Sequence, residues 1–241
     1  MAEILVIGAG GQLGTELTKA LANKYGNEAI IASDANESSR SKFDYCRFET
    51  LNILDKEALS NLINKEAIQQ VYHLAAILSA VGEKNPVQAW DLNMGGLLNV
   101  LEVAKEFSIS KVFWPSSIAV FGPHSDKDNT PQKSFKDPNT VYGISKLAGE
   151  HWCEYYFNKY GVDVRSLRYP GLIGYKSAPG GGTTDYAVSI YHDALKSRSH
   201  ECFLKEGTVL PMLYMPDALK ATLDIMHAPA ENIKIRTSYN L

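Results

Sequence analysis

The sequence predicts an α/β fold, a doubly wound parallel sheet, and three observations lead to that prediction. A continuous apolar run at residues 4–7 passes directly into glycines. Leu13, Leu17 and Leu21 follow with helical spacing, so the chain is predicted to begin with a strand, a tight turn and a helix. Further on, short apolar runs alternate with longer helical segments. Such alternation is typical of parallel strands joined by right-handed helical crossovers.

The later elements are predicted from apolar runs and helical periodicity between turn signals. Strands are expected at residues 29–32, 71–74, 111–114 and 162–167. Helices are expected near residues 12–25, 56–64, 87–107 and 141–160. These elements, in this order, complete a doubly wound Rossmann sheet.

Residues 169–184 break the alternation, because they are rich in glycine and proline and therefore predict a loop. Loops of this kind often line binding sites. We expect a dinucleotide-binding Rossmann core over residues 1–168 and a small substrate-covering lobe over residues 169–241. Apolar and polar side chains alternate over residues 233–238, which predicts that the chain ends inside or just after a strand.

The composition indicates a folded protein with a small-molecule partner. Of the 241 residues, 45% are apolar and 21% are charged, enough to form one substantial core. The formal net charge is −3 and the 24 basic residues are scattered, so no surface for nucleic acid or an anionic membrane is predicted. The apolar run at residues 4–7 is too short for a signal peptide or a membrane span, so a cytoplasmic location is expected.

The three cysteines, Cys46, Cys153 and Cys202, lie far apart and form no CxxC pair. This spacing argues against both a disulfide framework and a structural zinc site. We therefore expect a protein of a reducing compartment that holds no metal.

A glycine motif directly after the first strand predicts a dinucleotide site. Gly8, Gly11 and Gly14 form GxxGxxG and open the first helix. The first glycine permits the turn, the second admits a pyrophosphate to the backbone, and the third lets the helix pack against the strand. The helix N-terminus then attracts the phosphates. A glycine-rich turn without a ligand is the alternative, which the strand–turn–helix context makes the weaker one.

Asp34 indicates which dinucleotide binds. It lies at the end of the second predicted strand, where a carboxylate accepts hydrogen bonds from both hydroxyls of the adenosine ribose and repels a 2′-phosphate. No arginine follows before Arg40, so NAD is favoured over NADP. An ordinary turn or helix-capping aspartate is the alternative.

Tyr142 and Lys146 form a YxxxK pair, which a helix stacks on one face. Asn139 and Thr140 signal the start of that helix, and Gly161 signals its end. A lysine ammonium and the positive nicotinamide ring both stabilise a phenolate, so Tyr142 is predicted to act as a base near neutral pH. Chance spacing on an amphipathic helix is the alternative.

Two serines, Ser116 and Ser117, follow the predicted strand at residues 111–114. The carboxyl ends of such strands face the cofactor crevice. A hydroxyl there holds the substrate alcohol and steadies the developing carbonyl oxygen. We assign this role to Ser117, whereas Ser116 can instead cap the backbone at the strand end.

Four motifs in order, GAGGQLG, HLAA, WPSSIAVFG and YGISK, resemble the extended short-chain dehydrogenase/reductase family over nearly the whole chain. More narrowly, the stretches HLAAILSAVGEKNP, VRSLRYPGLIGY, PGGGTTDYAV and LPMLYMPDAL are similar to the short-chain-type L-threonine 3-dehydrogenases. That group differs from the zinc-dependent threonine dehydrogenases, in agreement with the scattered histidines and cysteines here.

The resemblance implies a role for many residues, with Ser117, Tyr142 and Lys146 at the catalytic positions. The implied dinucleotide residues are Gly8, Gly11, Gln12, Leu13, Gly14, Asp34, Asn52, Ile53, Leu74, Ala75, Ala76, Asn93, Tyr142, Lys146, Tyr169 and Pro170. The implied substrate residues are Ser79, Ser117, Tyr142, Gly171, Thr183, Thr184 and Asp185. Within these sets, Asn52 and Ile53 are expected to flank adenine, and Lys146 to bond the nicotinamide ribose.

The segment around Thr183 and Thr184 suits an amino-acid substrate, because hydroxyls and free backbone N–H groups after three glycines can receive a carboxylate. Asp185 can attract the substrate ammonium or cap a helix that begins near Tyr186, and both interpretations stay open. The glycines at residues 180–182 also suggest a segment that closes over the substrate.

Together these features predict NAD-dependent oxidation of the secondary alcohol of L-threonine to 2-amino-3-oxobutyrate, with Tyr142 as the base. The alternatives are a nucleotide-sugar epimerase or dehydratase of the same family, and a non-catalytic NAD-sensing protein. Family members usually continue past residue 241, which implies an incomplete substrate lobe and affects substrate binding more than NAD binding. The resemblance also implies a homodimer formed through residues 87–107 and 141–160.

Overall fold

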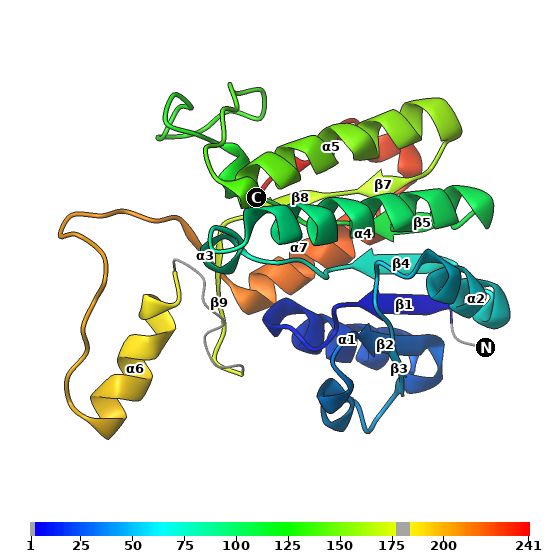
Figure 1. Ribbon diagram of the computed structural model, residues 1–241, viewed down its shortest axis with the longest axis horizontal. Coiled ribbons are helices and arrows are strands. Elements are labelled where there is room, and N and C mark those ends of the chain that lie inside the picture. Colours follow the sequence, from blue (N-terminus) through cyan, green and yellow to red (C-terminus); the bar gives the residue numbers. More distant parts are fainter. Residues whose placement is uncertain (1–2, 177–183) are drawn as a thin grey trace.

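The computed structural model describes residues 3–176 and 184–241. Its centre is a six-stranded sheet in the order β3-β2-β1-β4-β5-β7, in which every neighbouring pair is parallel (Figure 1). The strands are β1 (Ile4–Ile7), β2 (Ile30–Asp34), β3 (Arg47–Thr50), β4 (Gln70–His73), β5 (Lys111–Phe113) and β7 (Val164–Arg165). This strand order is that of a doubly wound sheet, which confirms the predicted fold class.

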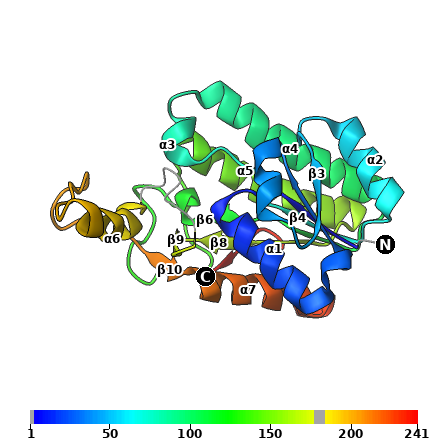
Figure 2. The same ribbon diagram turned by 90° about the horizontal axis from the view of Figure 1, so that it is seen from below.

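Helices cover both faces of the sheet (Figure 2). On one face lie α2 (Lys56–Glu66), α4 (Pro86–Glu106) and α5 (Val141–Tyr160), and on the other lie α1 (Gln12–Tyr25) and α7 (Met215–His227). Leu59, Leu101 and Cys153 form part of the first core, and Leu17 and Ala218 form part of the second, each with 0% of its surface exposed. Each face of the sheet is therefore sealed by its own apolar core.

The ends of α5 follow the sequence signals. The Thr140 hydroxyl oxygen accepts a hydrogen bond from the Gly143 N–H at 3.0 Å, which satisfies a backbone donor in the first turn. Gly161 ends the helix with φ of 74°, in the left-handed region that favours glycine. Because both ends are fixed locally, the helix occupies the predicted residues 141–160.

Two smaller sheets lie at the carboxyl edge of the central one. The first contains β6 (Ser116–Ser117), β8 (Leu167–Tyr169) and β11 (Tyr239–Asn240), and the second contains β9 (Gly171–Ile173) and β10 (Met212–Tyr214). The remaining helices are α3 (Ser79–Gly82), α6 (Tyr186–Lys196) and the 3-10 turns η1 (Asn27–Ala29), η2 (Glu37–Lys42), η3 (Ile118–Val120) and η4 (Ala230–Asn232). In the described ranges, no helix has both the length and the apolar content that a bilayer span requires.

Two strand predictions are wrong in detail. The strand expected at residues 162–167 is broken at Ser166, whose carbonyl accepts from Tyr239 N at 3.0 Å, so β7 and β8 join different sheets. The strand expected near residue 241 is β11, at Tyr239–Asn240, and residues 233–238 do not belong to it. The backbone N–H groups of Lys234 and Ile235 instead donate to the Tyr239 hydroxyl at 2.8 and 3.0 Å. A contact between distant residues thus decided the first segment, and a local side-chain contact decided the second.

A further strand lies in the segment predicted to be a loop. Within residues 169–184, β9 pairs with β10, and Gly171 N donates to the Pro211 carbonyl at 3.1 Å. The partner strand lies some forty residues later, so the local glycine and proline content gave no sign of it. Strand β3 was likewise not predicted.

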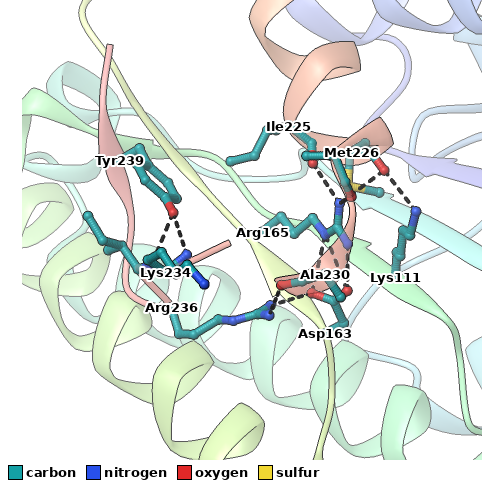
Figure 3. Close-up of polar contacts among 11 residues, drawn as sticks. Lys111, Asp163, Arg165, Ile225, Met226, Ala230, Lys234, Arg236 and Tyr239 are labelled. Atoms are coloured by element: carbon teal, nitrogen blue, oxygen red, sulfur yellow. Dashed lines mark hydrogen bonds and ion pairs between the residues drawn. The ribbon is translucent and has the colours of Figure 1, made fainter. Parts of the chain in front are cut away.

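A buried arginine fastens α7 to the sheet (Figure 3). The Arg165 guanidinium donates to the carbonyls of Ile225, Met226 and Ala228 at 2.7, 3.2 and 2.6 Å. Asp163 pairs with it at 2.7 Å. These carbonyls end α7 and have no partner within the helix, so the buried cation satisfies them and holds α7 over the central sheet.

Candidate active site

The glycine turn after β1 has the shape that a pyrophosphate needs. Gly8 has φ of +78°, and a Cβ atom there would lie 2.6 Å from Ala75 N. At Gly14 a Cβ would lie 2.4 Å from the Gly8 carbonyl oxygen, so α1 can pack here only without a side chain. At Gly11 the nearest such atom is 3.5 Å away. The turn is therefore closely packed against the protein at Gly8 and Gly14, and it leaves space at Gly11. Gly11 lies at the N-terminus of α1, where backbone N–H groups attract phosphate.

Asp34 is held against this turn from the end of β2. One carboxylate oxygen accepts from Gly10 N at 2.9 Å, and the other accepts from Asn36 N at 3.0 Å. Arg40 forms an ion pair with Glu37 and donates to the Phe48 carbonyl at 3.0 Å. The first arginine after the turn is thus engaged elsewhere, and a carboxylate faces the place of the adenosine ribose. Together with the glycine turn, this arrangement fits NAD.

Most of the residues predicted for cofactor binding and catalysis meet in one cavity of about 620 Å³. Of the residues that the sequence predicts for the site, its lining includes Gly8, Gly11, Gln12, Leu13, Gly14, Leu74, Ala76, Ser79, Ser117, Tyr142, Lys146, Tyr169, Pro170, Gly171, Thr184 and Asp185. Five others, Asp34, Asn52, Ile53, Ala75 and Asn93, do not line it. Thr183 and the glycines at residues 180–182 lie outside the described residues.

Asn93 does not line the cavity, but its side chain binds the backbone of a segment that does. Its side-chain oxygen accepts from Ile77 N at 2.8 Å, and its amide nitrogen donates to the Ile77 carbonyl at 3.1 Å. The clamp fixes the segment between Ala76 and Ser79. Asn52 accepts from Leu54 N at 3.1 Å, and Ile53 is buried, packed below Gly96.

The two serines of β6 both line the cavity, but their hydroxyls make different contacts. The Ser117 hydroxyl oxygen accepts from Ala119 N at 3.1 Å and lies at the cavity. The Ser116 hydroxyl donates to Glu150 Oε1 at 2.7 Å, and only 2% of Ser116 is exposed. Ser116 therefore does not cap the strand end, and Ser117 is the serine available to a substrate.

Lys146 is almost fully buried beneath Tyr142. Its ammonium donates to the Pro115 carbonyl at 2.7 Å and lies 4.5 Å from the centre of the Trp114 ring and 5.5 Å from the centre of the Tyr142 ring. The indole reaches this place because Gly149 has no side chain, since a Cβ there would lie 2.4 Å from Trp114 Cη2. Burial lowers the pKa of Lys146 to about 7, and the negative charge of Glu150 opposes this shift.

Tyr142 departs from the simple expectation of a phenolate. Burial raises its pKa to about 12, and a hydrogen bond with Ser117 acts in the opposite direction. The phenol is thus protonated at neutral pH in the chain without its cofactor. The positive charge of the oxidised nicotinamide is what NAD supplies here when bound, beside a phenol that Ser117 and Lys146 already orient.

His73, at the end of β4, is a residue that the sequence reasoning did not single out. It is 1% exposed, and within the described part of the chain neither ring nitrogen has a hydrogen-bond partner. Burial and then the charge of Lys146 lower its pKa to about 3, so the imidazole is neutral under ordinary conditions. Its place in the HLAA motif was the available signal.

The substrate side of the cavity is formed by Ser79, Thr184 and Asp185. Gly171 lets β9 pass close by, because a Cβ there would lie 2.3 Å from Thr184 Cγ2. Asp185 lines the cavity directly before α6. Both interpretations of this residue, a contact with the substrate and a helix cap, stay predictions.

Several lining residues were not predicted: Leu78, Pro115, Ile118, Ala119, Phe121, Leu172, Leu210 and Pro211. Some continue the WPSSIAVFG motif beyond its serines and could have been found there. Leu210 and Pro211 could likewise have been found in the stretch LPMLYMPDAL, and the pairing of β9 with β10 brings them to the cavity. Over residues 3–176 and 184–241, no three His, Cys, Asp or Glu side chains are grouped so as to hold a metal ion.

Comparison with known proteins agrees with this site. Residues 4–241 match the model of the NAD dependent epimerase/dehydratase family. An uncharacterized epimerase/dehydratase of Staphylococcus saprophyticus is 45% identical over 242 residues, which cover 100% of this chain and 75% of that protein. Among solved structures, the holo form of a GalE-like L-threonine dehydrogenase from Cupriavidus necator is 53% identical with a TM-score of 0.96, over 99% of this chain and 77% of that one. An L-threonine dehydrogenase from Clostridium difficile is 47% identical with a TM-score of 0.94, over 100% and 76%.

Proposed function

Because the chain belongs to the NAD-dependent epimerase/dehydratase family, with the fold and cofactor of an extended short-chain dehydrogenase/reductase, we propose that it oxidises L-threonine. The reaction converts the secondary alcohol to a ketone, giving 2-amino-3-oxobutyrate and NADH. Bound NAD supplies the hydride acceptor at nicotinamide C4. The residues of the chain supply the remaining requirements, which are a base, a hydrogen-bond donor for the reacting oxygen, and groups that orient an amino acid.

Each proposed role follows from a contact in the cavity. Tyr142, once deprotonated, takes the proton of the β-hydroxyl, and its ring lies above the buried ammonium of Lys146. Ser117 holds the reacting oxygen and steadies it as the carbonyl forms. In this proposal Asp185 attracts the substrate ammonium and Thr184 binds the carboxylate. The proton leaves Tyr142 towards Lys146 and solvent.

The charge of the cavity lining is the observation that carries the choice of substrate. Among the described residues that line the cavity, Lys146 is the sole lysine or arginine, and it lies below the catalytic tyrosine. A nucleotide sugar carries a diphosphate, which proteins commonly bind with several cations. Asp185 adds a negative charge on the substrate side. This lining suits a small zwitterion better than a second nucleotide diphosphate.

The direct test is to mix the protein with NAD and L-threonine and to follow the absorbance of NADH. We expect turnover with L-threonine and little with 2-butanol, which keeps the secondary alcohol but lacks the groups that Thr184 and Asp185 bind. Uridine diphosphate sugars are the comparison for the epimerase alternative. Turnover of a nucleotide sugar without turnover of threonine would overturn the proposal. NAD binding with no turnover of any alcohol would favour the sensing alternative.

The homodimer stays a prediction. Trp152 and Tyr155 on α5 are 39% and 43% exposed, so this helix presents aromatic surface that a second copy can bury. The mass in solution at micromolar concentration decides the matter, and a monomeric mass would reject the dimer.

A further inference from the structure

A fully buried ion pair lies directly behind the catalytic residues. Glu150 Oε1 accepts from Arg168 Nε at 2.7 Å, and Oε2 accepts from Arg168 Nη2 at 2.7 Å. Each side chain is 1% exposed. A buried pair of this kind is expensive to desolvate and contributes little net stability compared with apolar residues of the same volume. Its retention therefore calls for a role beyond stability.

Both ends of the pair connect it to the active site. Glu150 lies one helical turn after Lys146 on α5, and its Oε1 also accepts from the Ser116 hydroxyl at 2.7 Å. Ser116 precedes Ser117 on β6, and Ser116 pairs with Arg168 in the register of β6 and β8. A single carboxylate thus joins α5, which carries Tyr142 and Lys146, to the strand that carries Ser117.

We propose that Glu150, held by Arg168, is a positioning residue for the reaction: it fixes Ser116 and with it β6, and it keeps a negative charge beside the buried ammonium of Lys146. This inference rests on the proposed function for its catalytic consequence. The effect of the carboxylate on Lys146 belongs to the chain alone.

The surroundings of Lys146 leave Glu150 as the group that can supply this charge. The titratable groups that face Lys146 are Tyr142, Glu150 and Cys153 on α5 and His73 on β4. Arg168 on β8 and Lys136 before α5 face Glu150, and α4 presents the uncharged Asn93 and Leu97 to α5. Burial raises the pKa of the Cys153 thiol far above its ordinary value, so no thiolate is present at neutral pH. His73 and Tyr142 are uncharged there as well. The carboxylate therefore offsets part of the cost of burying the ammonium.

Loss of the Glu150 charge should lower the pH at which activity declines. Lys146 must remain an ammonium to favour the phenolate form of Tyr142, and it loses its proton as the pH rises through its pKa. Removal of the Glu150 charge lowers that pKa further, so the ammonium disappears at a lower pH. Activity should then decline at a lower pH on the alkaline side.

Two variants separate the effect of the Glu150 charge from the effect of the hydrogen bonds that hold the pair together. Glu150→Gln keeps the shape and an acceptor for Ser116 but removes the charge, whereas Arg168→Lys keeps both charges but breaks the two-pronged hydrogen bonding. The titration of Lys146 is read in the cofactor-free protein by NMR of lysine labelled at Cε, with Lys146→Arg identifying the resonance. We expect Glu150→Gln to lower the midpoint by about one pH unit. Arg168→Lys should leave it within a few tenths of the wild-type value.

A structural role alone predicts that the two variants behave alike, since both break the same pair. Equal shifts, or no shift in Glu150→Gln, would overturn the proposal. If Glu150→Gln does not fold, Glu150→Gln is combined with Arg168→Gln to give a neutral buried pair. Its midpoint must lie below that of Arg168→Gln alone, because the two proteins differ only in the carboxylate.

Turnover gives the second readout. With L-threonine as substrate, the alkaline limb of kcat should move to lower pH in Glu150→Gln, with KM for threonine within about twofold, and should not move in Arg168→Lys. If the wild-type protein does not oxidise threonine, the proposed function fails, and the NMR titration still decides the role of Glu150.

Discussion

The sheet and the segment around α6 are packed very differently. Every residue of β1 is at most 2% exposed, whereas α6 contains no buried residue, and its Tyr191 and Leu195 are 72% and 87% exposed. Figure 1 shows α6 standing away from the strands that carry the glycine turn. In the proposed function, the well-packed region sets the geometry of hydride transfer, and Thr184 and Asp185, directly before α6, contact the substrate.

Replacement of the proposed base, Tyr142, gives the largest expected contrast between these regions. Tyr142→Phe removes the base, so kcat should fall by about 10²–10⁴-fold while NAD affinity is retained. Tyr191→Phe on α6 is the matched control and should keep wild-type turnover. Steady-state formation of NADH and a fluorescence titration with NAD measure the two effects. Near-normal activity of Tyr142→Phe would show that the base is another group.

Truncation of one leucine in each region tests the packing itself. Leu101→Ala in α4 leaves a cavity in a core that is 0% exposed and should cost about 2–5 kcal/mol in the free energy of unfolding. Leu195→Ala in α6 should change it by less than about 0.5 kcal/mol. Denaturant titrations give both values. Similar losses for the two variants would mean that α6 is packed in solution as tightly as the sheet.

Alanine variants of two glycines with positive φ separate the cost of steric overlap from the cost of backbone strain. Gly8→Ala combines strain with overlap at Ala75 N, so it should lose about 2–4 kcal/mol of unfolding free energy and most NAD affinity. Gly161→Ala has no neighbour within 4 Å and should lose only about 1 kcal/mol, with NAD affinity intact. The comparison fails if both variants bind NAD equally well.

The smallest expected effect is the acid sensitivity that His73 confers on the sheet. Its folded pKa, about 3, lies below the ordinary value of 6.5, so its contribution to stability is present above pH 6.5 and is lost as the pH falls towards 3. At pH 5 the loss should be about 2 kcal/mol. His73→Leu should remove this part of the pH dependence, measured by denaturant titrations at several pH values. His192→Leu, on exposed α6, should leave it unchanged.

The sequence predicted the parts of the site that local chemistry fixes. Gly8 and Gly14 are required by the turn itself, and Thr140 and Gly161 end α5 through their own backbone contacts, so Tyr142 and Lys146 fall on a helix as expected. These signals need no knowledge of distant residues. The fold class and the cofactor followed from them.

The parts of the fold and of the site that the sequence did not predict depend on contacts between distant segments. Ser166 interrupts a strand because Tyr239 pairs with its carbonyl, and Pro211 reaches the cavity because β10 pairs with β9. The protonated state of Tyr142 depends on how deeply the fold buries it. No spacing of residues along the chain contains that information.

A crystal structure with bound NAD tests most directly whether Tyr142 is the base. We expect the Tyr142 hydroxyl to face the side of nicotinamide C4 on which a substrate alcohol would lie, with Lys146 within hydrogen-bonding reach of the nicotinamide ribose. A tyrosine oxygen directed away from that carbon, or a nicotinamide bound outside the cavity shared with Ser117, would contradict it.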